Sequence, residues 1–123
     1  MSDLKRDYRL RSSVDLPTYR YRYAGNFTNI SPTTWLGAYH SSELPMLFGT
    51  HPNFRGDSTP DEYALSAKMQ DLYVAFARDG VTGLEAQGWP RYDNSSGQGL
   101  IQQFGLDGQI TQLQTADWLE RTC

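Results

Sequence analysis

The clearest pattern along the chain is an alternation of aromatic and basic side chains, formed by Tyr19, Arg20, Tyr21, Arg22 and Tyr23. A period of two residues is typical of a β-strand with one aromatic face and one polar face. Residues 25–34 carry Gly, Asn, Ser and Pro, which favour loops. We therefore expect a strand over residues 18–24 that runs into a loop.

A second pattern, with helical spacing, begins at Thr59. This threonine can act as N-cap, Pro60 suits the first turn, and Glu62 completes a capping box. Apolar side chains then recur at helical spacing, at Leu65, Met69, Leu72 and Phe76. Gly80 is placed to end the helix. The pattern predicts an amphipathic helix over 60–79 whose apolar stripe lies in the core, followed by a turn-rich stretch over 81–99.

Shorter segments complete the predicted framework. The polar residues 1–16 predict a frayed helix that ends before Pro17. A short helix is expected from Ser41 or Ser42, as a cap, to about Phe48. Two alternating runs, 100–105 and 109–113, are joined around Asp107-Gly108, a dipeptide typical of two-residue hairpins. Residues 115–121 predict a helical turn.

Composition and charge narrow the function classes. The 123 residues suit one domain, and 38% hydrophobic with 20% charged residues fits a globular segment. A net charge of -3 and a pI near 5.2 argue against a nucleic-acid partner. No run of about 18 apolar residues is present, so no membrane span is expected. We interpret the local excess of positive charge as a solvated face formed by Lys5, Arg6, Arg9, Arg11, Arg20 and Arg22.

The sequence leaves localisation undetermined. Residues 1–7 are charged and lack an apolar core, so no signal peptide is visible. Three glycosylation sequons, at Asn26, Asn29 and Asn94, nevertheless favour a secreted parent protein. The single cysteine, Cys123, cannot form an internal disulfide.

Four segments in a fixed order carry a family resemblance: Tyr21–Phe27, Gly37–Pro45 (GAYHSSELP), Phe48-Gly49-Thr50 and Gly88–Tyr92 (GWPRY). Over about residues 15–123 the chain resembles the C-terminal part of type B carboxylesterases, α/β-hydrolases that include cholinesterases and fungal lipases. The likeness is greatest to fungal members. It implies that residues 1–123 are an incomplete α/β domain. They would contribute one strand of the main sheet, amphipathic helices and a C-terminal hairpin.

The resemblance also implies a chemistry, the hydrolysis of carboxylic esters without cofactor or metal. His40 would be the general base of a serine triad, and Glu43 would support the histidine region. In this fold the triad follows the order Ser, then Asp or Glu, then His. The 123 residues contain no Gly-x-Ser-x-Gly motif. We therefore expect the nucleophile and the acid upstream, an isolated chain that is inactive, and an N-terminal fragment as its partner. A parallel neighbour for the strand over 18–24 is expected from outside the chain as well.

Several alternatives remain open. Without the resemblance, a lone histidine beside Tyr39 is more often structural than catalytic. A metal site from His40, Glu43, His51 and Asp57 is conceivable, but two histidines eleven residues apart match no established zinc spacing. We expect His51 to be an exposed loop residue. The chain could also be a non-catalytic, partner-binding fragment or a pseudoenzyme product, or an unrelated fold that shares these motifs by chance.

Overall fold

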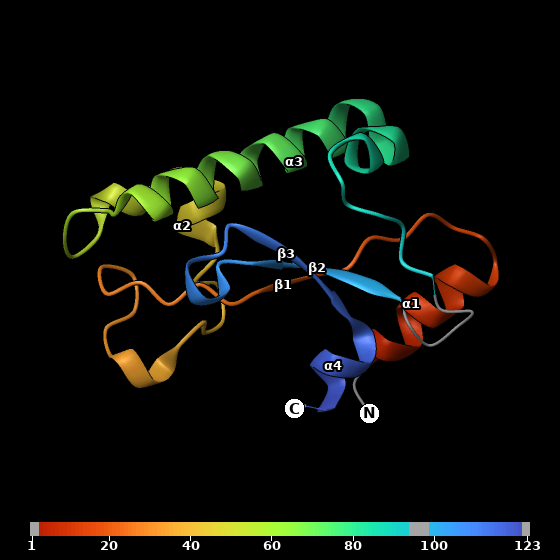
Figure 1. Cartoon of the computed structure of the whole chain (residues 1–123), viewed down its shortest axis with the longest axis horizontal. Coiled ribbons are helices and arrows are strands. Elements are labelled where there is room, and N and C mark those ends of the chain that lie inside the picture. Colours follow the sequence, from red (N-terminus) through yellow and green to blue (C-terminus); the bar gives the residue numbers. More distant parts are fainter. Residues whose placement is uncertain (1–2, 94–98, 122–123) are drawn as a thin grey trace.

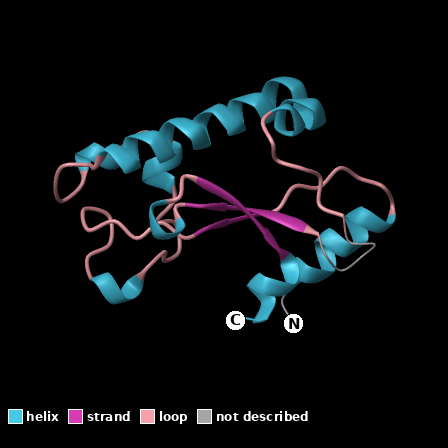
Figure 2. Ribbon diagram, viewed as in Figure 1, coloured by secondary structure: helices cyan, strands magenta, loops and turns pink. Residues whose placement is uncertain are grey.

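A small mixed sheet lies between helices in this protein (Figures 1 and 2). The computed structural model describes residues 3–93 and 99–121. In chain order the helices and strands are α1 Asp3–Ser13, β1 Tyr21–Tyr23, the 3-10 turn Thr34–Leu36, α2 Leu44–Leu47, the 3-10 turn His51–Asn53, α3 Pro60–Ala86, β2 Leu100–Phe104, the 3-10 turn Leu106–Gly108, β3 Thr111–Thr115 and α4 Ala116–Arg121.

The sheet has the order β1-β2-β3. β1 pairs in parallel with β2, with Tyr21 opposite Gln102, and β2 pairs antiparallel with β3. The amide of Ala24 donates to the carbonyl of Phe104 at 2.8 Å and extends the parallel pairing. The expectation that the parallel neighbour comes from outside the chain is therefore wrong for this edge, which β2 occupies. On the other edge of β1, the described residues contribute no strand.

The predicted hairpin is confirmed, but its turn is longer than predicted. The last cross-strand pair is Phe104 with Thr111, so residues 105–110 form the loop. Asp107 and Gly108 do adopt positive φ angles, of 49° and 78°. They lie inside a 3-10 turn that Gly105, itself at φ 76°, opens. The dipeptide thus has the backbone conformation of a tight turn without being the whole connection.

Two hydrophobic clusters cover opposite faces of the sheet. Alternation along β2 places Phe104 in one cluster and Ile101 in the other. The larger cluster joins α2 and α3 to the sheet and contains Ile30, Met46, Leu65, Met69, Leu72, Leu84, Trp89 and Phe104. The smaller one joins α1 and α4 to the opposite face and contains Tyr8, Tyr92, Ile101, Ala116 and Leu119. Figure 1 shows α3 on one side of the sheet and α1 with α4 on the other.

The helix predicted over 60–79 is confirmed. Its capping box is complete: the Thr59 amide donates to Glu62 Oε2 at 2.6 Å and the Glu62 amide donates to Thr59 Oγ1 at 3.3 Å. Gly80, at φ 54° and ψ -126°, breaks the helical conformation as predicted. Residues 81–86 are helical again, so the turn-rich prediction is wrong there. After the kink, Leu84 reaches the core.

The predicted apolar stripe is wrong at one position. Leu65, Met69 and Leu72 are buried, but Phe76 is 52% exposed. Its ring instead lies edge-on to Tyr19, with centroids 6.2 Å apart. An apolar groove of about 250 Å³ runs here between α3 and β1. Helical spacing alone therefore does not bury the last residue of the stripe, which borders this groove.

The interpretation of the basic residues as a solvated face is wrong for Arg20. Its guanidinium lies over the rings of Tyr8, at 3.8 Å, and Tyr92, at 4.8 Å. Such a cation–π arrangement is favourable because the ring faces are electron-rich. Arg9, Arg11 and Arg22 are exposed, as predicted, and the side chains of Lys5 and Arg6 lie outside the described part. Arg20, the residue before β1, thereby helps to hold α1.

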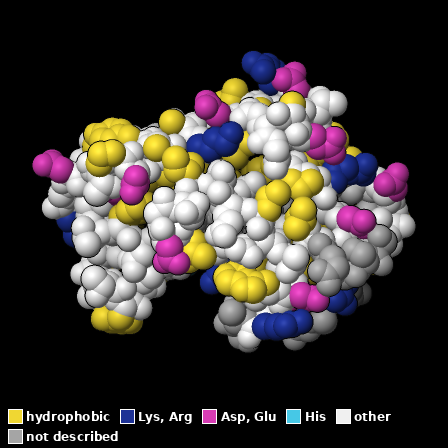
Figure 3. All heavy atoms as spheres, in the orientation of Figure 1, with side chains coloured by type: hydrophobic (Ala, Val, Ile, Leu, Met, Phe, Trp, Pro, Cys, Tyr) yellow, Lys and Arg dark blue, Asp and Glu magenta, His cyan; other side chains and the backbone are white. Residues whose placement is uncertain are grey.

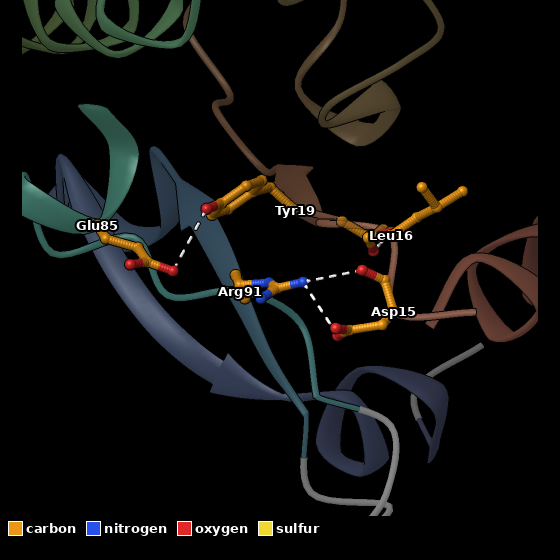
Figure 4. A network of polar contacts seen from close by, with 6 residues as sticks. Asp15, Leu16, Tyr19, Glu85 and Arg91 are labelled. Atoms are coloured by element: carbon orange, nitrogen blue, oxygen red, sulfur yellow. Dashed lines mark hydrogen bonds and ion pairs between the residues drawn. The ribbon is translucent and has the colours of Figure 1, made fainter. Parts of the chain in front are cut away.

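Polar contacts near the start of β1 join segments that are distant in sequence (Figure 4). Arg91 Nη2 donates to the carbonyl of Asp15 at 3.3 Å and to its Oδ1 at 3.4 Å. The Tyr19 hydroxyl donates to the carbonyl of Val81 at 3.1 Å and contacts Glu85 Oε1 at 3.5 Å. These contacts hold the last turns of α3 and the segment after it against the segment that enters the sheet.

The surface in Figure 3 mixes hydrophobic side chains with acidic and basic ones over the face that carries α3. The exposed large hydrophobic residues of this helix are Tyr63, Val74 and Phe76. Among the helices of the described residues, none combines the length and the apolar character needed to cross a bilayer.

Two alanine substitutions in α3 test which residues of the apolar stripe belong to the core. Leu72→Ala should lower the free energy of unfolding by about 2–5 kcal/mol, because it removes a fully buried side chain. Phe76→Ala should cost about 1 kcal/mol or less, because the side chain is half exposed. Urea denaturation of both variants measures the difference, and equal losses would contradict this assignment of the core.

Candidate functional site

His40 lies at the start of a turn that leads into α2, and its side chain is exposed. An exposed imidazole meets the first requirement of a general base, which must reach a partner hydroxyl. The backbone around it is bent sharply: Gly37 has φ 56° and Ser41 has φ 68°. We call residues 37–43 the His40 loop.

Hydrogen bonds hold the backbone of the His40 loop on both sides of His40. The Tyr39 hydroxyl donates to the carbonyl of Ile30 at 3.1 Å, and Ser31 Oγ donates to the carbonyl of Gly37 at 3.0 Å. On the other side of His40, the amide of the buried Ser42 donates to the carbonyl of Tyr39 at 3.0 Å. An exposed ring is therefore carried on a backbone that buried groups fix.

Glu43, the predicted supporting residue, is half-buried and is the N-cap of α2. Its side chain makes no capping hydrogen bond. The prediction that Ser41 or Ser42 caps this helix is wrong, because Glu43 occupies the N-cap position. Burial raises the pKa of the Tyr23 hydroxyl, and the negative charges of Glu62 and Glu43 raise it further. The pKa of Tyr73 is also raised, by burial first and more weakly by Glu43. The charge of Glu43 thus acts on two tyrosines, Tyr23 and Tyr73, whose pKa values are raised.

His51 is not the exposed loop residue that the sequence predicts. It is 2% exposed, its Nδ1 lies 2.6 Å from Ser58 Oγ, and its ring meets the edge of Tyr63 at 4.8 Å. Burial lowers the pKa of this histidine, and the nearby Glu62 partly opposes the shift. The local sequence did hold one weak signal. The capping box at Thr59 places the preceding residue, Ser58, at the start of α3. A side chain from the loop before α3, such as His51, can contact Ser58 there.

The three predicted sequons differ in structure. Asn26 is exposed and donates to the carbonyl of Thr34 at 3.1 Å. Asn29 is only 5% exposed, and its Nδ2 contacts the carbonyls of His51 (3.3 Å) and Gly56 (3.5 Å) and the hydroxyl of Ser58 (3.2 Å). A glycan on Asn29 would require these contacts to be lost. Asn94 and Cys123 lie outside the described residues.

The predicted site residues therefore separate into two places. His40 and Glu43 share the His40 loop, whereas His51 belongs to a buried cluster behind it. Across the part of the chain that the structure describes, no three His, Cys, Asp or Glu side chains gather as metal ligands would. The arrangement can offer one accessible base, His40, to a hydroxyl that approaches from outside the chain.

Comparison with known proteins places this arrangement in a family of hydrolases. A model of the carboxylesterase family matches residues 3–117. The chain therefore belongs to the carboxylesterase family. It is 45% identical over 118 residues to secreted lipase 5 of Gibberella zeae, and 41% identical over 128 residues to the chlorogenic acid esterase of Aspergillus niger. These alignments cover 96% and 92% of this chain but only 22% and 25% of the relatives.

A solved structure of a PNB esterase has the same fold over most of the chain. The TM-score is 0.64, and the match covers 89% of this chain and 22% of the esterase, at 23% sequence identity. The mixed sheet and its helices therefore have the arrangement of part of an α/β-hydrolase. The family and fold that the resemblance implied are confirmed.

His51 should make the stability of the chain depend on pH. Its pKa in the folded state is lowered from the usual 6.5. Above that pH the ring is neutral in both states. As the pH falls below it, the unfolded chain binds a proton that the folded chain does not, so stability decreases until the pKa of the folded state is reached. Urea midpoints between pH 7.5 and 5 measure this loss.

Two single substitutions separate the histidines in that experiment. His51→Asn removes the titrating group and should flatten the profile over this range. His40→Asn leaves the buried contacts of His51 in place, so the loss of stability caused by His51 should remain. A profile that His40→Asn flattens instead would contradict the assignment.

Proposed function

We propose that the chain is the part of a carboxylic ester hydrolase that supplies the triad histidine, His40. The observation that supports it best is an exposed imidazole on a loop whose backbone is held by part-buried hydrogen bonds before His40 and by the Ser42 amide after it. Fungal relatives of the same family are named as a lipase and an esterase. Because the chain spans about a quarter of their length, the nucleophile and the acid would belong to the rest of the protein.

In this proposal His40 takes the proton of a serine hydroxyl as the oxygen attacks the ester carbonyl. The imidazolium then gives the proton to the leaving alcohol, and the same ring activates the water that releases the acyl group. A carboxylate from elsewhere would orient the ring. Glu43 would have a supporting role near Tyr23 and Tyr73, and no step of this chemistry needs a metal or a cofactor.

The unpaired edge of β1 supports association with the rest of the protein. Within the described residues, β1 has a neighbour on one side only. Unpaired strand edges readily accept another strand. We infer that an upstream segment adds there, which would bring the nucleophile of the protein to the side of the sheet where the loop after β1 carries His40.

A chimera tests the catalytic role of His40. In secreted lipase 5 of Gibberella zeae, the 22% of the protein that matches this chain would be replaced by residues 1–123. The chimera should hydrolyse an activated aryl ester, and His40→Gln should reduce kcat/KM by at least about 10³-fold. Asn26→Ala is the control, because it changes an exposed side chain in the segment between β1 and His40.

The chain alone should show no His40-dependent turnover above the imidazole background. A folded chimera whose activity survives His40→Gln would refute the role of His40. The alternative, a non-catalytic fragment that binds a partner, predicts association with the upstream segment but no ester hydrolysis in the chimera.

A further inference from the structure

The most unusual cluster outside the proposed site is the one around Asn29, His51 and Ser58. His51 and Asn29 are 2% and 5% exposed, and Ser58 is half-buried. The three side chains form one connected set, because Asn29 Nδ2 contacts Ser58 Oγ at 3.2 Å and Ser58 Oγ contacts His51 Nδ1 at 2.6 Å. We call this set the Asn29 clamp. Polar groups in a buried place are costly to keep unless they form a complete network.

The Asn29 clamp is anchored to the most regular element of the fold, α3. Ser58 directly precedes the capping box of this helix, in which Thr59 and Glu62 bond to each other. The ring of His51 packs against Tyr63 in the first turns of α3, with centroids 4.8 Å apart. The clamp therefore has a fixed base.

From this base the hydrogen bonds lead to the His40 loop. Arg55, in the same loop as His51, donates from its amide to the carbonyl of Asn29 at 3.3 Å and from Nη1 to the carbonyl of Ile30 at 2.8 Å. The carbonyl of Ile30 also accepts the hydroxyl of Tyr39, the residue before His40. Asn29 and Ile30 thus connect the start of α3 to the loop that carries the exposed histidine.

We propose that the Asn29 clamp positions the His40 loop and that it does so only while the His51 ring is neutral. This proposal rests on the proposed role of His40, to which it adds a positioning residue, His51. In the assigned arrangement the Asn29 amide donates to Ser58 Oγ, and the Ser58 hydroxyl donates to the unprotonated Nδ1 of His51. Each group then has the partner that its chemistry needs.

Protonation of His51 breaks this arrangement. A protonated ring carries hydrogen on both nitrogens, so Nδ1 can no longer accept from Ser58, and the serine proton needs another acceptor in a crowded place. Four charged or titratable groups face or flank His51. Glu62 and Tyr63 come from α3, and Arg55 and Asp57 come from the loop that contains His51. The side chain of Asn29, from the segment after β1, is neutral. Glu62 is 1% exposed and offers the ring a negative charge; its Oε2 accepts from the Thr59 amide, and its Oε1 has no hydrogen-bond partner among the described residues. A protonated His51 is therefore expected to turn away from Ser58 and loosen the clamp.

Hydrogen exchange of the whole 123-residue chain tests the proposal, with rates corrected for the intrinsic effect of pH. In the wild type, amides of residues 29–31 and 37–43 should lose protection at least about 10-fold between pH 7.5 and pH 5, while those of residues 62–76 change less than 2-fold. His51→Asn keeps an acceptor near the position of Nδ1 and cannot titrate, so its His40 loop should stay protected at both values. Ser58→Ala removes the central hydroxyl and should expose the loop at both.

The control is Asn26→Ala, which removes an exposed asparagine side chain and its bond to Thr34 in the same connection. It should leave the protection of residues 37–43 as in the wild type. The ring nitrogens of His51, assigned with the help of His40→Asn because the chain has two histidines, give a second measurement by NMR. At neutral pH the proton should be on Nε2.

Three results would overturn the proposal: protection of the His40 loop that does not change with pH in the wild type, a His51→Asn variant that keeps the pH dependence, or a neutral His51 that carries its proton on Nδ1. None of these measurements uses enzyme activity. An inactive chimera with a pH-sensitive loop would refute the proposed function and leave the clamp, whereas an active chimera with a pH-insensitive loop would refute the clamp alone.

Discussion

The packing of α3 against β2 is the contact on which the rest of the structure depends. Leu65, Met69 and Leu72 are each at most 1% exposed, and they meet Phe104 in the larger cluster. This contact fixes β2, which holds β1 in parallel and β3 antiparallel. It also fixes the start of α3, against which the segments before and after the His40 loop are arranged. Burial of apolar area supplies the free energy, and the polar contacts then select one arrangement.

Local signals in the sequence were sufficient where neighbouring residues decide the structure. The capping box at Thr59 and the break at Gly80 depend on contacts within a few residues, and both are confirmed. The hairpin was also predictable, but not its loop length, because Asp107-Gly108 favours the same backbone angles in a two-residue turn and in a six-residue loop. Phe76 follows the helical spacing and is still half exposed, since burial depends on what other segments pack against the helix, and Phe76 borders a groove.

Contacts between distant parts of the sequence were beyond such reasoning. β1 and β2 are about 80 residues apart, and the sequence of neither strand indicates that it pairs with the other. The candidate base, His40, was found through a family resemblance, which the comparisons support at the level of the family. The burial of His51 could not be predicted for a general reason: a histidine in a polar loop looks solvated unless its partners from other segments, here Asn29 and Tyr63, are known.

The different proposed roles of His40 and His51 follow from the exposure of one ring and the burial of the other. A general base must reach a reactant, so its ring must be exposed, and an exposed ring on a loop has few contacts of its own to hold it. Precise placement must then come from the backbone, and here the backbone is fixed through Tyr39 and the carbonyl of Ile30. A buried histidine suits the task behind the loop, because burial keeps it neutral and a neutral imidazole can accept a hydrogen bond. The same burial makes that support sensitive to acid, so the loop should be least ordered at low pH.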